Sequence, residues 1–141
     1  MGNLTELTQL TLRDCRLDAV PDWVANLTKL DDLWLNGNRL TALPDWFASL
    51  AELRKLYLHG NHFAELPARV GKLANLTLLD ISGCRLTAVP DWIANLTELT
   101  DLRLDNNRLT ELPEWLGGLG GLSFLTLHDN QLTELPELCP T

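Results

Sequence analysis

Leucine recurs along the chain with a period of 23 residues. The segments that open at Leu7, Leu30, Leu53, Leu76, Leu99 and Leu122 share one pattern: LxxLxLxx, then Asn or Cys, then xLxx, then Leu or Val followed by Pro. Such a period is typical of a solenoid, in which each unit is too short to bury its own apolar residues and packs against its neighbours. The pattern predicts a single domain, residues 1–141, with a partial repeat 1–6, repeats 7–29, 30–52, 53–75, 76–98 and 99–121, and a truncated repeat 122–141.

Each repeat is predicted to contain a short strand, a turn and a short helical segment. In repeat 30–52, Leu33 and Leu35 alternate with residues that are polar or aromatic, so one set faces the core and the other faces solvent. Further along the repeat, Pro44 presets φ for a first helical turn, and Asp45 lies near the positive end of the helix dipole. The return segment is expected to be helical or irregular, and too short for a long helix.

The turn after each strand carries an Asn or, in two repeats, a Cys. The asparagines are Asn38, Asn61, Asn107 and Asn130, and the cysteines are Cys15 and Cys84. An Asn amide donates and accepts, so it can satisfy backbone groups that the turn would otherwise bury unpaired, and stacked copies are expected to form an asparagine ladder. The two thiols are expected to be buried there as weaker donors. Three strand spacings of about 4.8 Å separate them by roughly 14 Å, too far for a disulfide.

The pattern resembles the leucine-rich repeat family in its 23-residue form, with Leu-Pro after the turn, and is similar to Ras-suppressor-like and many bacterial members. The resemblance covers residues 3–138. It implies an α/β fold: a right-handed, curved solenoid with a parallel β-sheet on the concave face and short helical or irregular segments on the convex face. It also implies a surface for protein recognition, but it does not identify the partner.

Side chains that face outward from the predicted strands form rows, because equivalent positions of adjacent repeats lie about 4.8 Å apart. In the central rows a Trp neighbours a Tyr, and charged residues flank both, a composition that binding hot spots favour. The expected partner-binding residues are Trp34, Tyr57, Lys55, Asp80, Arg103, His59 and Asp32. The alternative is that the aromatic rings pack together and merely cover the sheet. Charges along the rows are expected to pair as Asp80 with Arg103, Asp32 with Lys55, and Asp105 with His128.

Two further rows recur outside the strands. One contains Trp23, Trp46, Trp92 and Trp115, interrupted by Arg69. These tryptophans are expected to pack edge to edge along the back of the solenoid, or else to form an apolar docking ridge. The other row follows the turn and contains Arg16, Arg39, Arg85 and Arg108, with His62 and Gln131. Its arginines are expected to reach nearby acids, although they could also hold an anionic partner; the acids are Glu65, Glu111 and Glu134.

Composition narrows the class of partner. The 19 acidic and 11 basic residues give a net charge of -8, which disfavours nucleic acid and membrane surfaces. No apolar stretch approaches the length of a membrane span, and the chain opens into repeat sequence without a signal peptide. Together with the unpaired cysteines, these features predict a cytoplasmic location.

Catalysis, a metal site and a cofactor are not predicted. His59 and His128 lie three repeats apart, too distant to share a metal. Ser82 neighbours His59 and lies near aspartates, but a flat parallel sheet suggests neither an oxyanion hole nor a deep pocket.

The predicted function is a non-enzymatic scaffold that binds a protein or peptide on the concave sheet. Two alternatives remain: an engineered or excised repeat block that mainly self-associates through uncapped ends, and a sensor segment of a larger signalling protein. Self-association is expected to give a homodimer, because Leu127 and Leu132 at one end, and Leu10 and Leu12 at the other, lack a complete neighbouring repeat.

Overall fold

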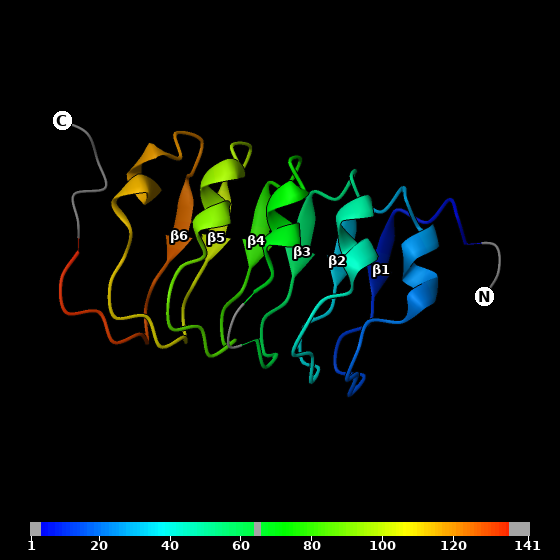
Figure 1. Cartoon of the computed structure of the whole chain (residues 1–141), viewed down its shortest axis with the longest axis horizontal. Coiled ribbons are helices and arrows are strands. Elements are labelled where there is room, and N and C mark those ends of the chain that lie inside the picture. The colour runs from blue at the N-terminus through cyan, green and yellow to red at the C-terminus, as the bar shows by residue number, and fades with distance from the viewer. Residues whose placement is uncertain (1–3, 64–65, 136–141) are drawn as a thin grey trace.

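A computed structural model describes residues 4–63 and 66–135 of the chain. The outermost parts of the two predicted partial repeats, residues 1–3 and 136–141, lie outside this description. Figure 1 shows short strands side by side along the long axis of the molecule, with helical turns on the opposite side. The strands form one parallel sheet in sequence order: β1 (Gln9–Thr11), β2 (Asp32–Trp34), β3 (Lys55–Tyr57), β4 (Leu78–Asp80), β5 (Asp101–Arg103) and β6 (Phe124–Thr126). The predicted repeat solenoid with a parallel sheet is confirmed.

Every strand pairs with the next in a register of one repeat. Leu33 lies opposite Leu56, and Trp34 lies opposite Tyr57. The same offset of 23 residues joins all the other neighbouring strands. The central leucines of β2 to β5 are fully buried, because alternate residues of a strand point to opposite faces of the sheet.

The return side of each complete repeat contains a five-residue 3-10 helix. These are η1 (Asp22–Asn26), η2 (Asp45–Ser49), η3 (Ala68–Lys72), η4 (Asp91–Asn95) and η5 (Glu114–Gly118). Each follows a proline in extended conformation, as at Pro44 with φ -68°, and each buries one apolar residue, such as Phe47 in η2. A single tight turn suffices for one inward contact per repeat, so no longer helix is needed.

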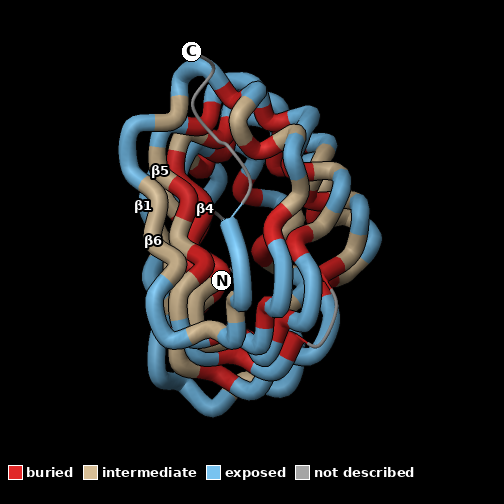
Figure 2. The backbone as a smooth tube through the Cα atoms, turned by 90° about the vertical axis from the view of Figure 1, so that its left-hand side faces the viewer, coloured by how far each residue is buried: buried red, intermediate tan, exposed pale blue. Residues whose placement is uncertain are grey.

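The apolar residues form one continuous core between the sheet and the 3-10 helices. In Figure 2 the buried segments line the inside of the coil, whereas exposed segments lie on its outside. The first and last repeats are covered less completely: Leu135 is 64% exposed, and only part of each side chain is buried at Leu10, Leu12, Leu17, Leu125, Leu127 and Leu132. Apolar surface therefore remains accessible at both ends of the described stack.

The turn asparagines bind the backbone of two repeats at once. Asn107 Oδ1 accepts hydrogen bonds from the N–H groups of Cys84 and Leu86, both at 3.0 Å. Its Nδ2 donates to the carbonyls of Ile81 and Leu104, again at 3.0 Å. Asn38 makes the same four bonds. Asn61 and Asn130 each make three of them, because the Oδ1 atom accepts from one N–H group instead of two. Each amide thus satisfies backbone groups in its own repeat and in the preceding one.

The two cysteines at the turn position differ from each other. Cys84 is buried, its Sγ donates to the Leu58 carbonyl at 3.2 Å, and burial raises the pKa of the thiol to about 12. Cys15 is exposed, so the expectation of a buried thiol there is wrong. Cys15 lies beside β1, on whose outer side the structure has no further strand to cover it.

Cys84 does not replace every bond of an asparagine. The N–H groups of Leu40 and Leu86 donate to the asparagine of the next repeat, at 3.0 Å in each case. The equivalent group lies at Phe63, opposite Cys84, and no hydrogen bond from it is found within the described part of the chain. A thiol is a weaker acceptor than an amide oxygen, so the boundary between the third and fourth repeats is less strongly bonded.

Removal of the Asn107 amide is expected to destabilise the fold, whereas a new amide at residue 84 is not. Asn107→Ala leaves buried backbone groups unpaired and should lower the free energy of unfolding by about 1–3 kcal/mol. Cys84→Asn supplies an acceptor for the Phe63 N–H and should be neutral or stabilising. Urea midpoints measure both effects, with the exposed Asn95→Ala as a control. Similar, negligible shifts in all three variants would mean that the turn position is solvated.

Candidate protein-interaction surface

A pair of stacked aromatic rings lies on the outward face of the sheet. Because β2 and β3 pair in register, Trp34 and Tyr57 are direct neighbours. Their ring centroids are 3.7 Å apart and their planes differ by 11°. The two rings therefore form one rigid apolar surface, as the sequence predicted for adjacent rows.

The two rings are unequally accessible. Trp34 is half-buried, whereas Tyr57 is 9% exposed. Burial raises the pKa of the Tyr57 hydroxyl, so this side chain remains uncharged at neutral pH. Trp34 thus offers most of the accessible aromatic surface, and Tyr57 mainly supports it.

Asp80 follows Tyr57 in the same row and is held by neighbours from three successive repeats. The residue is 3% exposed, and its carboxylate accepts hydrogen bonds from Ser82 Oγ at 2.7 Å and Ser82 N–H at 3.1 Å. His59 Nδ1 lies 2.9 Å from the other carboxylate oxygen, and Arg103 lies 3.8 Å from it. The predicted pairing of Asp80 with Arg103 is present, although His59 is the closer partner.

These contacts shift the pKa values of both partners. The hydrogen bond to Asp80 raises the pKa of His59, against the opposing effect of its partial burial. Burial by itself would raise the pKa of Asp80, but hydrogen bonds from His59 and Ser82 hold it below its ordinary value. A buried carboxylate that stays ionised needs this satisfaction of its oxygens.

The remaining charges of the surface only partly follow the predicted pairs. His128 lies 3.4 Å from Asp105, as expected. Asp32 and Lys55 form no ion pair in the described residues, so that prediction is wrong. An exposed pair contributes about 0–1 kcal/mol and pays the entropy of two ordered side chains, so register alone does not bring it together.

Phe124, which was not among the expected partner-binding residues, also lies on this surface. Its ring is 47% exposed, and the Arg103 guanidinium lies 5.5 Å from the ring centroid. Arg103 also lies 3.9 Å from Asp101. Phe124 lies opposite Asp101 in the register of β5 and β6, so the repeat predicts its position on the sheet. The repeat does not predict its contact with Arg103, which stands in a neighbouring row.

The arrangement of Ser82, Asp80 and His59 does not fit a nucleophilic triad. Ser82 Oγ donates to Asp80 and not to the imidazole, so no base is positioned to activate the hydroxyl. Within residues 4–63 and 66–135, no group of three His, Cys, Asp or Glu side chains is close enough to hold a metal ion. The cluster is best described as a polar network around one buried, hydrogen-bonded carboxylate on the outward face of the sheet.

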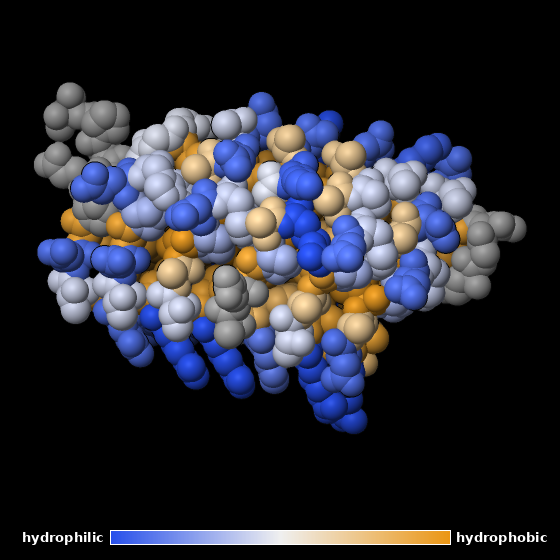
Figure 3. Space-filling view, in the orientation of Figure 1, coloured by the Kyte–Doolittle hydropathy of each residue, from blue (hydrophilic) through white to orange (hydrophobic). Residues whose placement is uncertain are grey.

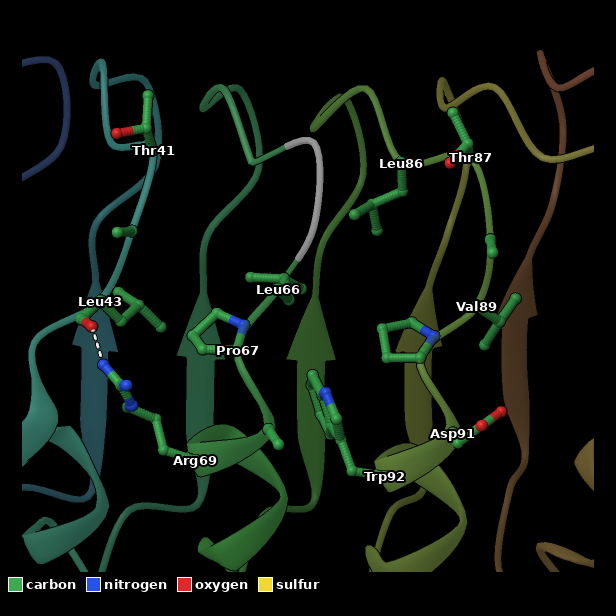
Figure 4. Close-up of a pocket in the computed structure, with 14 residues that line it drawn as sticks. Thr41, Leu43, Leu66, Pro67, Arg69, Leu86, Thr87, Val89, Asp91 and Trp92 are labelled. Carbon is green, nitrogen blue, oxygen red and sulfur yellow. Dashed lines mark hydrogen bonds between the residues drawn. The ribbon is translucent and has the colours of Figure 1, made fainter.

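A lateral groove of about 740 Å³ lies away from the strands. Figure 4 shows Leu43, Leu66, Pro67, Val89 and Trp92 around it, with Arg69 donating to the Leu43 carbonyl. Its lining is largely aliphatic and brings no set of polar groups together. A catalytic or cofactor pocket usually has such convergent polar groups, so the groove is a weaker candidate site than the sheet.

The tryptophan row packs differently from the prediction. The four tryptophans are partly buried against the core, but no contact between their rings is found among the described residues, where the aromatic pairs are Trp34 with Tyr57 and Trp46 with Phe47. Trp92 packs instead against the preceding repeat at Gly71. A Cβ atom added to Gly71 would lie 2.7 Å from Trp92 Cβ. Arg69 replaces Trp in the third repeat and pairs with Asp45 at 3.0 Å.

Family comparisons agree with this geometry. The fold and the surface define a solenoid protein with an open, outward-facing parallel sheet. One family model, described as a leucine-rich repeat region, matches residues 45–139, and a second, described as a leucine rich repeat, matches residues 5–63. The chain belongs to the leucine-rich repeat family. A search of curated proteins finds no significant sequence match.

Several solved structures share the fold. A leucine-rich repeat protein of Leptospira interrogans is 28% identical with a TM-score of 0.78, and the match covers 97% of this chain and 41% of that protein. An internalin of Listeria monocytogenes is 27% identical with a TM-score of 0.77, covering 94% and 45%. The leucine-rich repeat ectodomain of the receptor kinase SOBIR1 of Arabidopsis thaliana is 28% identical with a TM-score of 0.74, covering 92% and 74%. The chain thus spans less than half of the two bacterial proteins. None of the helices among the described residues could cross a membrane.

The Asp80 cluster is expected to make stability depend on pH. A raised pKa of His59 contributes stability that is fully present below the ordinary value of 6.5 and is lost as pH rises through the raised pKa. A lowered pKa of Asp80 contributes stability that is present above the ordinary value of 3.8 and is lost as pH falls through the lowered pKa. The pair is therefore most effective between these two ordinary values.

The variant His59→Asn tests this dependence, because its amide can still donate to Asp80 but does not titrate. The difference in urea midpoint between wild type and variant should be largest at about pH 5.5 and should shrink towards about pH 8.5. His62→Asn, an exposed histidine outside the cluster, is the matched control and should leave the profile of the wild type unchanged. A difference that is constant with pH would show that the pair does not titrate as described.

Proposed function

We propose that the chain is a non-enzymatic scaffold that binds a protein or peptide segment on the outward face of β2 to β5. The observation that carries this proposal is the stack of Trp34 on Tyr57 beside the buried, hydrogen-bonded Asp80. Trp and Tyr dominate binding energies at protein interfaces because they bury a large area with few rotatable bonds. The leucine-rich repeat family commonly mediates contacts between proteins, which agrees with this function.

The side chains of this surface are held in place before any partner arrives. Trp34 is stacked, and Asp80 is fixed by Ser82 and His59. Ordering a free side chain on binding costs about 0.5–1.5 kcal/mol. A surface that is already ordered avoids much of this cost, which supports a binding role over a mere cover for the sheet.

Charged side chains around the stack would set the orientation of the partner. Lys55 and Asp32 have no ion-pair partner among the described residues, so both are available to groups of the partner. Arg103, by contrast, is shared between Asp80, Asp101 and the ring of Phe124. We assign Trp34 as the main anchor, with Tyr57 supporting it by stacking. Lys55, Asp32 and Arg103 are the orienting residues, and His59 and Asp80 support them.

Trp34→Ala is expected to abolish most binding without unfolding the chain. Peptides selected from a phage-displayed random library on the wild-type chain provide the ligand. Their affinity, measured by fluorescence anisotropy, should fall by about 2 kcal/mol or more in the variant, the loss typical of a hot-spot aromatic. Tyr57→Ala should weaken binding as well, but it also removes a buried side chain, so its urea midpoint must be measured beside its affinity.

Trp115→Ala is the matched control, because it removes a half-buried tryptophan from the opposite side of the solenoid. Its affinity for the selected peptides should equal that of the wild type. Peptides that bind Trp34→Ala as tightly as wild type, or a library that yields no specific peptide, would contradict the assignment of this surface.

A second candidate function is self-association through the ends of the stack. The observation that favours it is the partly buried set of leucines in the last described repeat, including Leu127 and Leu132. Fully burying a leucine contributes about 1.5–3 kcal/mol, so several of them could support a dimer. In the remaining alternative, a sensor segment of a larger signalling protein, the outward face of β2 to β5 would be the binding surface.

Sedimentation is expected to show a dimer of the 141-residue chain that the double variant Leu127→Glu and Leu132→Glu dissociates. The contact is apolar, so added salt should not weaken it. The matched control is Thr110→Glu and Thr133→Glu, which adds the same charge at exposed positions and should leave the dimer intact. A wild-type chain that remains monomeric at tens of micromolar would remove this candidate.

A further inference from the structure

A row of arginines follows the turn along one edge of the solenoid, apart from the aromatic stack. It contains Arg16, Arg39, Arg85 and Arg108, with His62 in the third repeat. Backbone bonds join neighbouring repeats at this level: Arg39 N–H donates to Leu17 at 2.8 Å, and Arg108 N–H donates to Leu86 at 2.7 Å. The same position in successive repeats therefore lies next to its neighbours in one row. Figure 3 shows a line of hydrophilic side chains that project along one edge of the molecule.

These arginines are exposed and have no acidic partner in residues 4–63 and 66–135. Glu111 and Glu134 were expected to pair with them and do not, so that prediction is wrong; Glu65 lies outside the described residues. Other cations of the described chain do find carboxylates, as Lys29 does with Glu6 at 2.6 Å and Arg69 with Asp45 at 3.0 Å. Four of the seven Lys and Arg side chains outside the row are paired with carboxylates, whereas Arg13, Lys55 and Lys72 have no such pair in the described part of the chain. These three stand at different positions of the repeat, whereas the four arginines of the row share one position.

The charge balance of the chain makes this arrangement unusual. The chain has 19 acidic and 11 basic residues, and four of the basic ones stand at one position of the repeat. A guanidinium group binds a carboxylate through two parallel hydrogen bonds, which makes arginine well suited to recognise acidic groups. Four unpaired guanidinium groups in line therefore form a positive stripe on a negatively charged molecule.

We propose that this arginine row binds an acidic segment of a partner protein, laid along the axis of the solenoid. Four repeat steps of about 4.8 Å give the row a length of roughly 19 Å, which about six residues of extended chain would span. The surface is distinct from the outward face of the sheet and could be occupied at the same time.

The width and surroundings of the row favour a peptide over a nucleic acid. The row is one side chain wide, and acidic residues stand close to its members in sequence, among them Asp14, Asp18 and Glu111. Nucleic-acid sites are usually broad basic patches on domains with a high isoelectric point, whereas this chain has a pI of about 4.7. A single acidic chain can alternate charged and neutral residues and so avoid the flanking carboxylates.

Fluorescence anisotropy with a short labelled peptide of alternating Glu and Ser tests the proposal, with the corresponding Gln and Ser peptide as a neutral probe. The double variant Arg39→Gln and Arg108→Gln removes two members of the row whose backbone φ is not left-handed. Arg54→Gln with Lys72→Gln removes the same charge from exposed positions elsewhere. The row variant should bind the acidic peptide about tenfold more weakly than wild type, and the control less than about twofold more weakly.

Three further readouts decide the outcome. Affinity of the wild type should fall with salt, and the row variant should show a shallower dependence. Trp34→Ala should bind the acidic peptide like wild type, which separates this surface from the sheet face. Equal losses in both double variants, no wild-type binding at about millimolar peptide, or tighter binding of a single-stranded oligonucleotide than of the peptide would each overturn the proposal. Urea midpoints close to wild type verify that both double variants are folded.

Discussion

Backbone groups at the turn after each strand constrain how neighbouring repeats can stack. A turn amide such as Asn107 reaches the carbonyls of Ile81 and Leu104 and the N–H groups of Cys84 and Leu86, so it fixes two neighbouring repeats at one distance and one register. Because these groups are buried, a shift of the register would leave several of them unpaired. The leucine core supplies most of the driving force, but a non-directional force of this kind would not select a single offset.

The arrangement of side chains on the surface of the sheet follows from the offset of one repeat between neighbouring strands. Trp34 meets Tyr57 because β2 and β3 are displaced by one full repeat, and Asp80 meets His59 and Arg103 because the next strands follow the same rule. A recognition face on such a scaffold can change by substitution in one row without altering the strands beneath. This separation between the frame and the face explains why family membership does not determine the partner.

The repeat made the fold predictable, whereas the site was predictable only at the level of rows. The 23-residue period and the alternation of Leu33 with Trp34 were sufficient for the parallel sheet. They could not show that Asp80 would be buried, since its burial depends on the conformations of side chains from adjacent strands. Nor could they show whether Lys55 pairs with Asp32, because an exposed pair changes the free energy by less than the spread of its competing conformations.

The buried thiol of Cys84 can react only when the neighbouring repeats separate. This thiol lies between two repeats and donates a hydrogen bond to the Leu58 carbonyl, and its pKa of about 12 leaves almost no thiolate at neutral pH. Thiolate is the species that alkylating and oxidising reagents attack, so the folded protein shields this group both sterically and chemically. Cys15 is exposed and lacks that shield. The rate at which Cys84 is modified would therefore report how often the third and fourth repeats separate in the folded protein.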